Sequence, residues 1–461
     1  MIKSIKFGKD VFLGIKNARA QKRLFLTEAY QCKEAWNRRF DSPILQQVKP
    51  TDMFFELESK FNNTGKVSAI DIDIFANTVR EEFQVDELLD LIHKLRLSVE
   101  TTNTLTSTHQ AVIRFLLQYN RINDLLEILN DRLNYGIFPD YFCYNILMDK
   151  FIKEKNFALA AKIASLLMLQ EDNGHSISNA LSVYSCHRYL ENPDDWKKPE
   201  IKEDDSTEEI KVRVRYLRNP YFDDHFDLID PLQIVGKTLA FQGKHIDNSL
   251  GRTCQLRGLI LHKKYDKARE LIDKWLVEVN KEIVHEEVLD LIKHDNKHIP
   301  EDQITEDLKN LQIQLDNLKS SNLHKENLLE RIETEVKFAV EQYAETDTLR
   351  QQKSFLEWEK TRKSILKEHQ ALLEKELRLQ NIEKIKEELE KKEKVLTFFE
   401  NEEQIELEIE RKQELISQED ERIAKCPRKV KKLQKLVEQE VYIPPSLYKV
   451  SNANIYYAKN I

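Results

Sequence analysis

Glycine and proline are scarce in this chain, whose 461 residues include only 9 Gly and 11 Pro, far below average usage. A sheet protein of this length would need many more of both, because they supply the backbone conformations of tight turns. The scarcity excludes a strand-rich architecture and predicts an all-α fold. The hydrophobic fraction of 41% is sufficient for a core, and the length allows two or three domains.

Closely spaced cysteines and long apolar runs are also missing. The five cysteines are scattered without zinc-type spacing, which is typical of single thiols in a reducing compartment. No apolar run approaches the roughly 18 residues that cross a bilayer, so we predict no membrane span. His294 and His298 are four residues apart, but no third ligand is fixed nearby, and two solvated histidines are the better interpretation. We therefore predict no metal and no cofactor.

Catalytic motifs are absent as well. No glycine-flanked serine, activated cysteine or paired-carboxylate motif is present, so we expect no enzyme and no catalytic residue. The segment PLQIVGKT at 231–238 ends like a phosphate loop. Pro231, however, stands where such a loop requires its first glycine. Leu239, Ala240 and Phe241 follow it, and we interpret the whole segment as part of a helix.

Charge is abundant and unevenly distributed. The net charge of −8 argues against a protein that coats nucleic acid over its whole surface, but much of the acid follows residue 300. The first 26 residues, in contrast, carry seven Lys and Arg against Asp10 alone, with apolar residues between them. This composition is typical of a mitochondrial transit peptide, and an ordinary basic arm is the alternative. We assign residues 1–40 as a basic N-terminal segment that includes this transit peptide.

Two consecutive blocks of 35 residues, 106–140 and 141–175, share one pattern. In each block an apolar stripe is followed by a short polar bend and a second apolar stripe. Gly136 and Pro139 separate the blocks, since they favour the end of one helix and oppose its continuation. Because a helix pair of this size cannot bury its apolar face alone, consecutive pairs must stack. We predict a helical-repeat domain over residues 41–280.

An acidic insertion interrupts this domain near residues 191–210. It contains few apolar residues, and this composition predicts a solvated segment. Directly after it, basic and apolar residues alternate, which favours an extended basic segment that contacts phosphates; a charged loop beside an acidic one is the alternative. The basic residues are Arg213, Arg215 and Arg218.

The C-terminal part changes character at Pro300, since no glycine or proline occurs between Glu301 and Cys426. Spacings of three and four between apolar residues, as in Leu308, Leu311, Leu315 and Leu318, predict a coiled coil. We assign 281–300 as a linker, 301–440 as a long helical coiled-coil arm and 441–461 as an extended tail. Thr346 and Asp347 could cap a new helix, so the arm either folds back at these residues or forms one long rod. A second basic cluster, a candidate for phosphate contact, comprises Arg428, Lys429, Lys431 and Lys432.

The repeat segments YNILMDKFIKEKNFALA and YGIFPD resemble the pentatricopeptide repeat family. The resemblance implies a solenoid that binds single-stranded RNA with one base per repeat. Carried over to this chain, the base-reading positions are Gln110 with Asp140 and Asn145 with His175. Neither combination is usual in the family.

The stretch from about 130 to 170, together with LFLTEAYQCKEAW near the start, is similar to pentatricopeptide proteins of the small subunit of the mitochondrial ribosome. This resemblance implies a matrix protein that binds small-subunit ribosomal RNA and other mitochondrial ribosomal proteins and supports translation, with tRNA or mRNA as further candidate partners. Two alternatives stay open: a free-standing organellar RNA-binding factor acting on transcripts or tRNA, and a coiled-coil scaffold without RNA.

Overall fold

The computed structural model describes residues 25–196, 222–278, 282–296, 306–319, 323–397 and 399–425. Within these ranges the regular structure is helical, and the only extended pairing is an isolated bridge between His285 and His324. The predicted all-α class is confirmed. None of the described helices is both long enough and apolar enough to cross a membrane.

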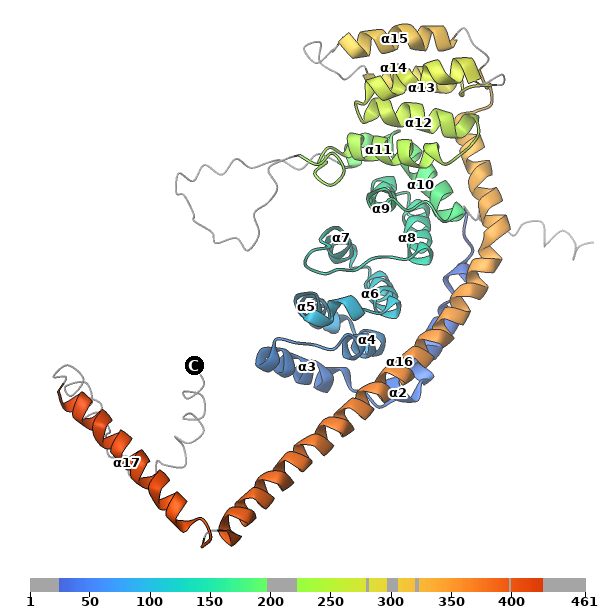
Figure 1. The fold of residues 1–461 in the computed structure, drawn as a ribbon. Helices are drawn as coiled ribbons and strands as arrows, with labels where there is room; N and C mark the ends of the chain where they lie inside the picture. Colours follow the sequence, from blue (N-terminus) through green and yellow to red (C-terminus); the bar gives the residue numbers. More distant parts are fainter. Residues whose placement is uncertain are drawn as a thin grey trace, which may run out of the picture. The chain divides into compact units, whose positions relative to one another are not determined.

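A stack of helical hairpins forms the first part of the chain (Figure 1). The first helices of the hairpins are α4 (Ala69–Thr78), α6 (Thr106–Gln118), α8 (Tyr141–Lys153), α10 (Ser176–Tyr189), α12 (Ser249–Leu261) and α14 (Glu287–Asn296). The second helices are α5 (Val85–Leu97), α7 (Ile122–Asn130), α9 (Phe157–Leu169), α11 (Pro231–Lys244), α13 (Tyr265–Glu278) and α15 (Glu306–Lys319). Helix α3 (Pro50–Thr64) packs on α4 and α5 at the start of the stack. The helix pairs predicted within 106–140 and 141–175 are confirmed.

The same tight turn joins the two helices of several hairpins. Asn120, Lys155 and Lys263 each have a positive φ, at 54°, 59° and 61°. The residue after each of them donates its backbone N–H to a carbonyl five positions earlier, as in Arg121 to Leu116 (3.0 Å). This is the hydrogen bond of a helix that ends in a left-handed residue. In these three hairpins, a turn of the same geometry therefore sets the angle between the first and the second helix.

The boundary between the two 35-residue blocks differs in detail from the prediction. Gly136 does have the left-handed backbone, with φ +64°. Helix α7, however, already ends at Asn130, so Gly136 lies in the loop and not at the end of the helix. A Cβ at Gly136 would lie 3.0 Å from Cδ of Arg96, whose Nε donates to the carbonyl of Leu133. The glycine therefore lets this loop pass close to α5.

Segment 231–238 forms the start of α11, as predicted. Pro231 occupies the first turn, and the Thr238 hydroxyl donates back to the Ile234 carbonyl (2.8 Å). Gly236 lies against α12, where a Cβ would be 2.8 Å from the Gly258 carbonyl oxygen. The glycine thus serves close helix packing. The acidic insertion falls between α10 and α11, and residues 197–221 lie outside the described ranges.

The predicted arm over 301–440 is not one element. Leu308, Leu311 and Leu318, assigned to its coiled-coil pattern, are buried in α15, which packs on α13. The chain then turns, and α16 runs from Leu328 to Leu396 without a break. Of the two alternatives, the fold-back at Thr346 and Asp347 does not occur. Helix α14 also lies within the stretch 281–300 that was assigned as a linker.

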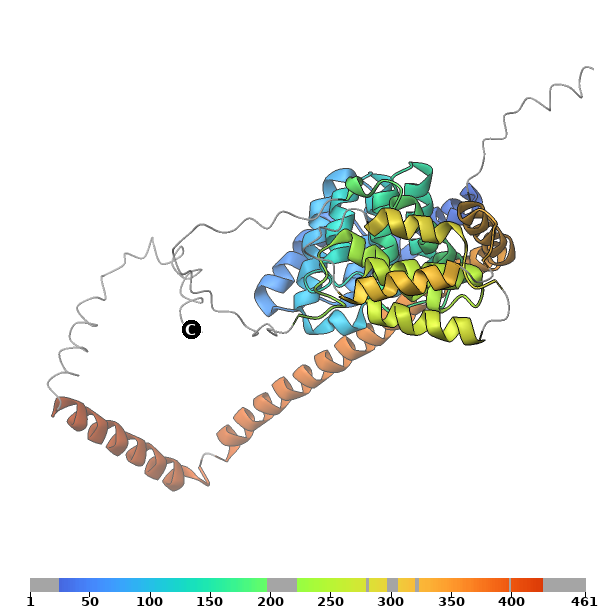
Figure 2. The same cartoon turned by 90° about the horizontal axis from the view of Figure 1, so that it is seen from above.

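The chain divides into two compact units, residues 1–366 and 367–461. In the first unit, α16 runs along one side of the stack, with a segment of short helices beside it (Figures 1 and 2). These short helices are η3 (Glu28–Gln31), α1 (Lys33–Asn37), η4 (Arg38–Asp41) and α2 (Pro43–Gln46). In the second unit the rest of α16 and α17 (Glu402–Ala424) expose most of their side chains.

Candidate nucleic-acid interface

Three of the four predicted base-reading residues lie in or at the start of α6 and α8, on the face of the stack that α16 and η3 cover. Gln110 is in α6, Asp140 caps α8 and Asn145 is one turn further along α8. Gln110 and Asn145 are 1% and 0% exposed. The described chain therefore presents neither amide to solvent.

Gln110 and Asp140, predicted as the reading pair of one repeat, are brought together but bond to each other. Nε2 of Gln110 donates to Asp140 (2.6 Å), and its Oε1 accepts from Nε2 of Gln351 in α16 (3.2 Å). The other oxygen of Asp140 accepts from the backbone N–H of Cys143 (2.8 Å). Both reading groups are thus engaged in capping α8 and in holding α16.

Asn145 and His175, the second predicted pair, belong to a buried network centred on Asp347 of α16. Asn145 donates to the Tyr30 hydroxyl (2.8 Å) and accepts from Ser178 (2.7 Å). The Tyr30 hydroxyl donates to Asp347 (3.1 Å), and Nε2 of His175 lies 3.0 Å from the same oxygen. Burial raises the pKa of Tyr30, so its hydroxyl stays protonated and remains a donor.

A buried ion pair fixes α16 near the other end of the covered face. Arg362 and Asp73 of α4 are 4% and 0% exposed in their side chains and form an ion pair. The second carboxylate oxygen of Asp73 accepts from Ser107 and from Thr108 (2.8 Å) at the start of α6. Both carboxylate oxygens therefore have polar partners, as a buried charge requires. One aspartate therefore joins three helices.

Apolar contacts complete the attachment of α16. Near its start, Leu328, Ile332, Val336 and Ala339 are buried in the main core. Near the end of the first unit, Ile365 and Leu366 pack with Ile70 and other residues of α2 and α4. Residues 328–366 thus form an integral layer of the first unit.

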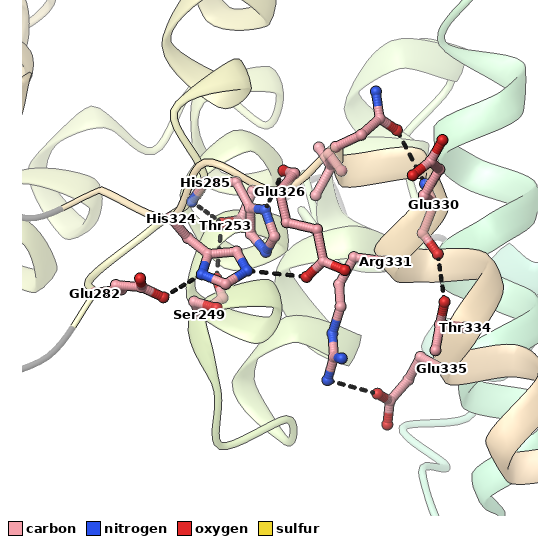
Figure 3. Close-up of polar contacts among 12 residues, drawn as sticks. Ser249, Thr253, Glu282, His285, His324, Glu326, Glu330, Arg331, Thr334 and Glu335 are labelled. Carbon is pink, nitrogen blue, oxygen red and sulfur yellow. Dashed lines mark hydrogen bonds and ion pairs between the residues drawn. The ribbon is translucent and has the colours of Figure 1, made fainter.

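The start of α16 is tied to the α13–α14 connection by two histidines (Figure 3). His324 contacts Glu282 through Nδ1 and Glu326 through Nε2, the latter at 3.0 Å. His285 is buried, and its backbone N–H donates to Thr253 of α12 (2.9 Å). The carboxylates of Glu326 and Glu282 raise the pKa of His324, whereas burial lowers the pKa of His285. A positive charge on His324 therefore strengthens this connection.

His324 should make stability depend on pH. Because its pKa is raised on folding, its contribution is fully present below the unfolded pKa of about 6.5 and is lost as pH rises through the folded pKa. Below a pH of about 6.5, we expect the urea midpoint of wild type to exceed that of His324→Gln. This difference should shrink as the pH rises through the folded pKa of His324. His225→Gln is the control, since that ring contacts the Leu169 carbonyl oxygen (3.0 Å) and, among the described residues, no carboxylate. A difference independent of pH would contradict the assignment.

The remaining predicted contact residues lie outside the described ranges. They are Arg213, Arg215, Arg218, Arg428, Lys429, Lys431 and Lys432.

The residues that hold α16 were not predicted from the sequence. The sequence does mark Asp73 as a candidate buried carboxylate, because it lies inside the apolar run AIDIDIFA. No pattern in the sequence marks Tyr30 or Arg362 in this way.

These features define an all-α protein of stacked helical hairpins, in which the face that carries the predicted base-reading residues is covered by the chain's own helix α16. Residues 2–388 match the family model of mitochondrial 28S ribosomal protein S27. The chain belongs to this family, and it is a mitochondrial protein of the small ribosomal subunit. The resemblance to small-subunit proteins of the mitochondrial ribosome is confirmed, whereas membership of the pentatricopeptide repeat family stays a prediction.

Proposed function

We propose that this chain is a structural, non-catalytic constituent of the mitochondrial small ribosomal subunit. In this role it binds small-subunit ribosomal RNA and neighbouring ribosomal proteins and thereby supports mitochondrial translation. It requires no cofactor. The family match supports the place in the mitochondrial small ribosomal subunit. The covered face of the hairpin stack supports the structural role.

The covered face is the observation that carries the proposal. A transcript-reading solenoid must offer its reading side chains to unpaired bases. Here Gln110 and Asn145 are buried, and their bonds to Gln351 and Tyr30 would have to break first. Leaving such groups unpaired is costly. A fixed place in a ribosome requires no such opening.

RNA contact is proposed for surfaces other than this face. Lysine and arginine side chains that neutralise phosphates give binding without base recognition. We assign this role to the basic segments at Arg213–Arg218 and Arg428–Lys432. The exposed apolar residues of α16 beyond the first unit, such as Ile382, Ile385 and Leu389, support a protein-contact surface.

Sedimentation of a mitochondrial lysate containing the tagged chain tests the proposal. We expect the chain to sediment with the small subunit after a high-salt wash, and its RNA crosslinks to fall on small-subunit ribosomal RNA. A free chain with crosslinks to particular transcripts or tRNA would instead show the free-standing factor. Retention in protein complexes without any RNA crosslink would show the scaffold. Either result would overturn the proposal.

A further inference from the structure

A cleft with a strongly basic lining lies beside the covered face, between the N-terminal short helices and the hairpin stack. Its volume is about 820 Å³, and among the residues that the structure describes no acidic one lines it. Five cationic residues do: Lys33, Arg39, Arg80, Arg114 and Lys150. They come from α1, η4, the loop after α4, α6 and α8, so the tertiary fold, and not a local run of charge, gathers them. We call this feature the arginine cleft.

Aromatic rings and backbone carbonyls, in place of carboxylates, orient its arginines. The guanidinium of Arg39 lies 4.1 Å from the ring centre of Trp36 and 3.9 Å from that of Phe40. Its Nη1 donates to the Trp36 carbonyl (3.0 Å). Arg80 covers the same Phe40 ring at 4.1 Å. These contacts hold the guanidinium groups in place without neutralising them.

Arg114 adds a half-buried positive charge to the cleft wall. Its Nη1 donates to the Gln31 carbonyl (3.0 Å), whereas its Nε and Nη2 have no hydrogen-bond partner in the described part of the chain. Burial lowers the pKa of Arg114. Burial and then the positive charges of Arg114, Arg362 and Arg80 lower the pKa of Arg39 to about 9. A bound anion would offset the repulsion among these guanidinium groups, because a nearby negative charge favours the protonated, positively charged form of arginine.

We propose that the arginine cleft binds the sugar–phosphate backbone of an RNA segment. The inference rests on the proposed function, in which the chain contacts ribosomal RNA. The volume fits a ligand the size of a short nucleotide segment and exceeds the needs of one free oxyanion. Trp36 and Phe40 are the aromatic residues of the described lining, and guanidinium groups already lie over both rings, so this lining offers bases no free ring to stack on. Recognition is therefore of phosphates and independent of sequence.

Titration of the purified full-length chain with a fluorescein-labelled RNA of about twelve nucleotides tests the cleft. The double variant Lys33→Gln/Arg80→Gln removes two exposed cations of its lining. We expect it to bind about tenfold or more weakly near physiological salt, with a log–log salt slope smaller by about two. Lys66→Gln/Lys244→Gln removes the same charge from exposed positions outside the cleft and should bind nearly as wild type does. Unfolding midpoints of both double variants check that the fold is kept.

Three outcomes would overturn the proposal that the arginine cleft binds RNA. If both double variants bind RNA equally, binding depends only on net charge. If inorganic phosphate displaces the RNA at equal phosphate concentration, the cleft is a site for small anions. If wild type binds no RNA at all, the RNA contact in the proposed function fails as well, whereas sedimentation with the small subunit tests the structural role separately.

Discussion

Arg362→Met is expected to lower the free energy of unfolding by about 3–5 kcal/mol, the usual cost of leaving a buried charge unpaired. The variant keeps a long apolar side chain in α16 but leaves Asp73 without its counter-charge. Asp73 is 0% exposed, and its remaining donors in the described part of the chain are the hydroxyls of Ser107 and Thr108 and the amide of Asn77. Urea unfolding measures the loss, and hydrogen exchange over residues 328–366 should show faster opening of α16.

Lys363→Met is the matched control for this experiment. Lys363 is the next residue in α16, and its ion pair with Glu359 is largely solvated, with the lysine side chain 54% exposed. Removal of such a pair costs about 0–1 kcal/mol. If the two variants lose equal stability, the buried ion pair does not hold α16. Asp73→Asn/Arg362→Met should be less destabilised than the sum of its single variants, because the unpaired charge is gone.

The helical hairpins could be predicted from sequence because their signals are local. Apolar stripes, polar bends and a fixed spacing of 35 residues lie within each block, and the left-handed turns at Asn120 and Lys155 follow from the same period. Helix α14 was missed although EEVLDLI at 286–292 repeats the pattern of DELLDLI in α5. The proximity of Pro300 favoured a linker, and tertiary burial of Val288 and Ile292 decided otherwise.

The covering of the hairpin stack by α16 could not be predicted, because its contacts join residues far apart in sequence. Tyr30 and Asp347 are separated by 317 positions, and Asp73 and Arg362 by 289. Asp347 was interpreted as a helix cap because aspartate favours caps, but its buried partners place it in the middle of a helix. Leucine spacing at 308–318 fits a coiled-coil seam and a solenoid helix equally, since both need one apolar stripe. Only the tertiary contacts separate these alternatives.

Gly258→Val is expected to destabilise the second half of the hairpin stack by about 3 kcal/mol or more, at the upper end of overpacking effects. Helices α11 and α12 approach each other through Gly236 and Gly258. A Cβ at Gly258 would meet the backbone nitrogen of Ala240 and lie 2.5 Å from the Gly236 carbonyl oxygen. Backbone atoms cannot rotate away as a side chain end can, so the two helices must separate. Urea unfolding and hydrogen exchange over residues 231–261 measure the effect.

Gly65→Ala separates packing from the conformational freedom of glycine. Gly65 ends α3 with φ +65°, and a Cβ there would meet no atom within 4 Å. Its replacement costs only the left-handed strain, about 1–2 kcal/mol. At Gly258 the backbone is helical, where a side chain would otherwise be favoured over glycine. A larger loss at Gly258 than at Gly65 can therefore come only from the close approach of α11 and α12, and a smaller one would mean that the helices slide apart at little cost.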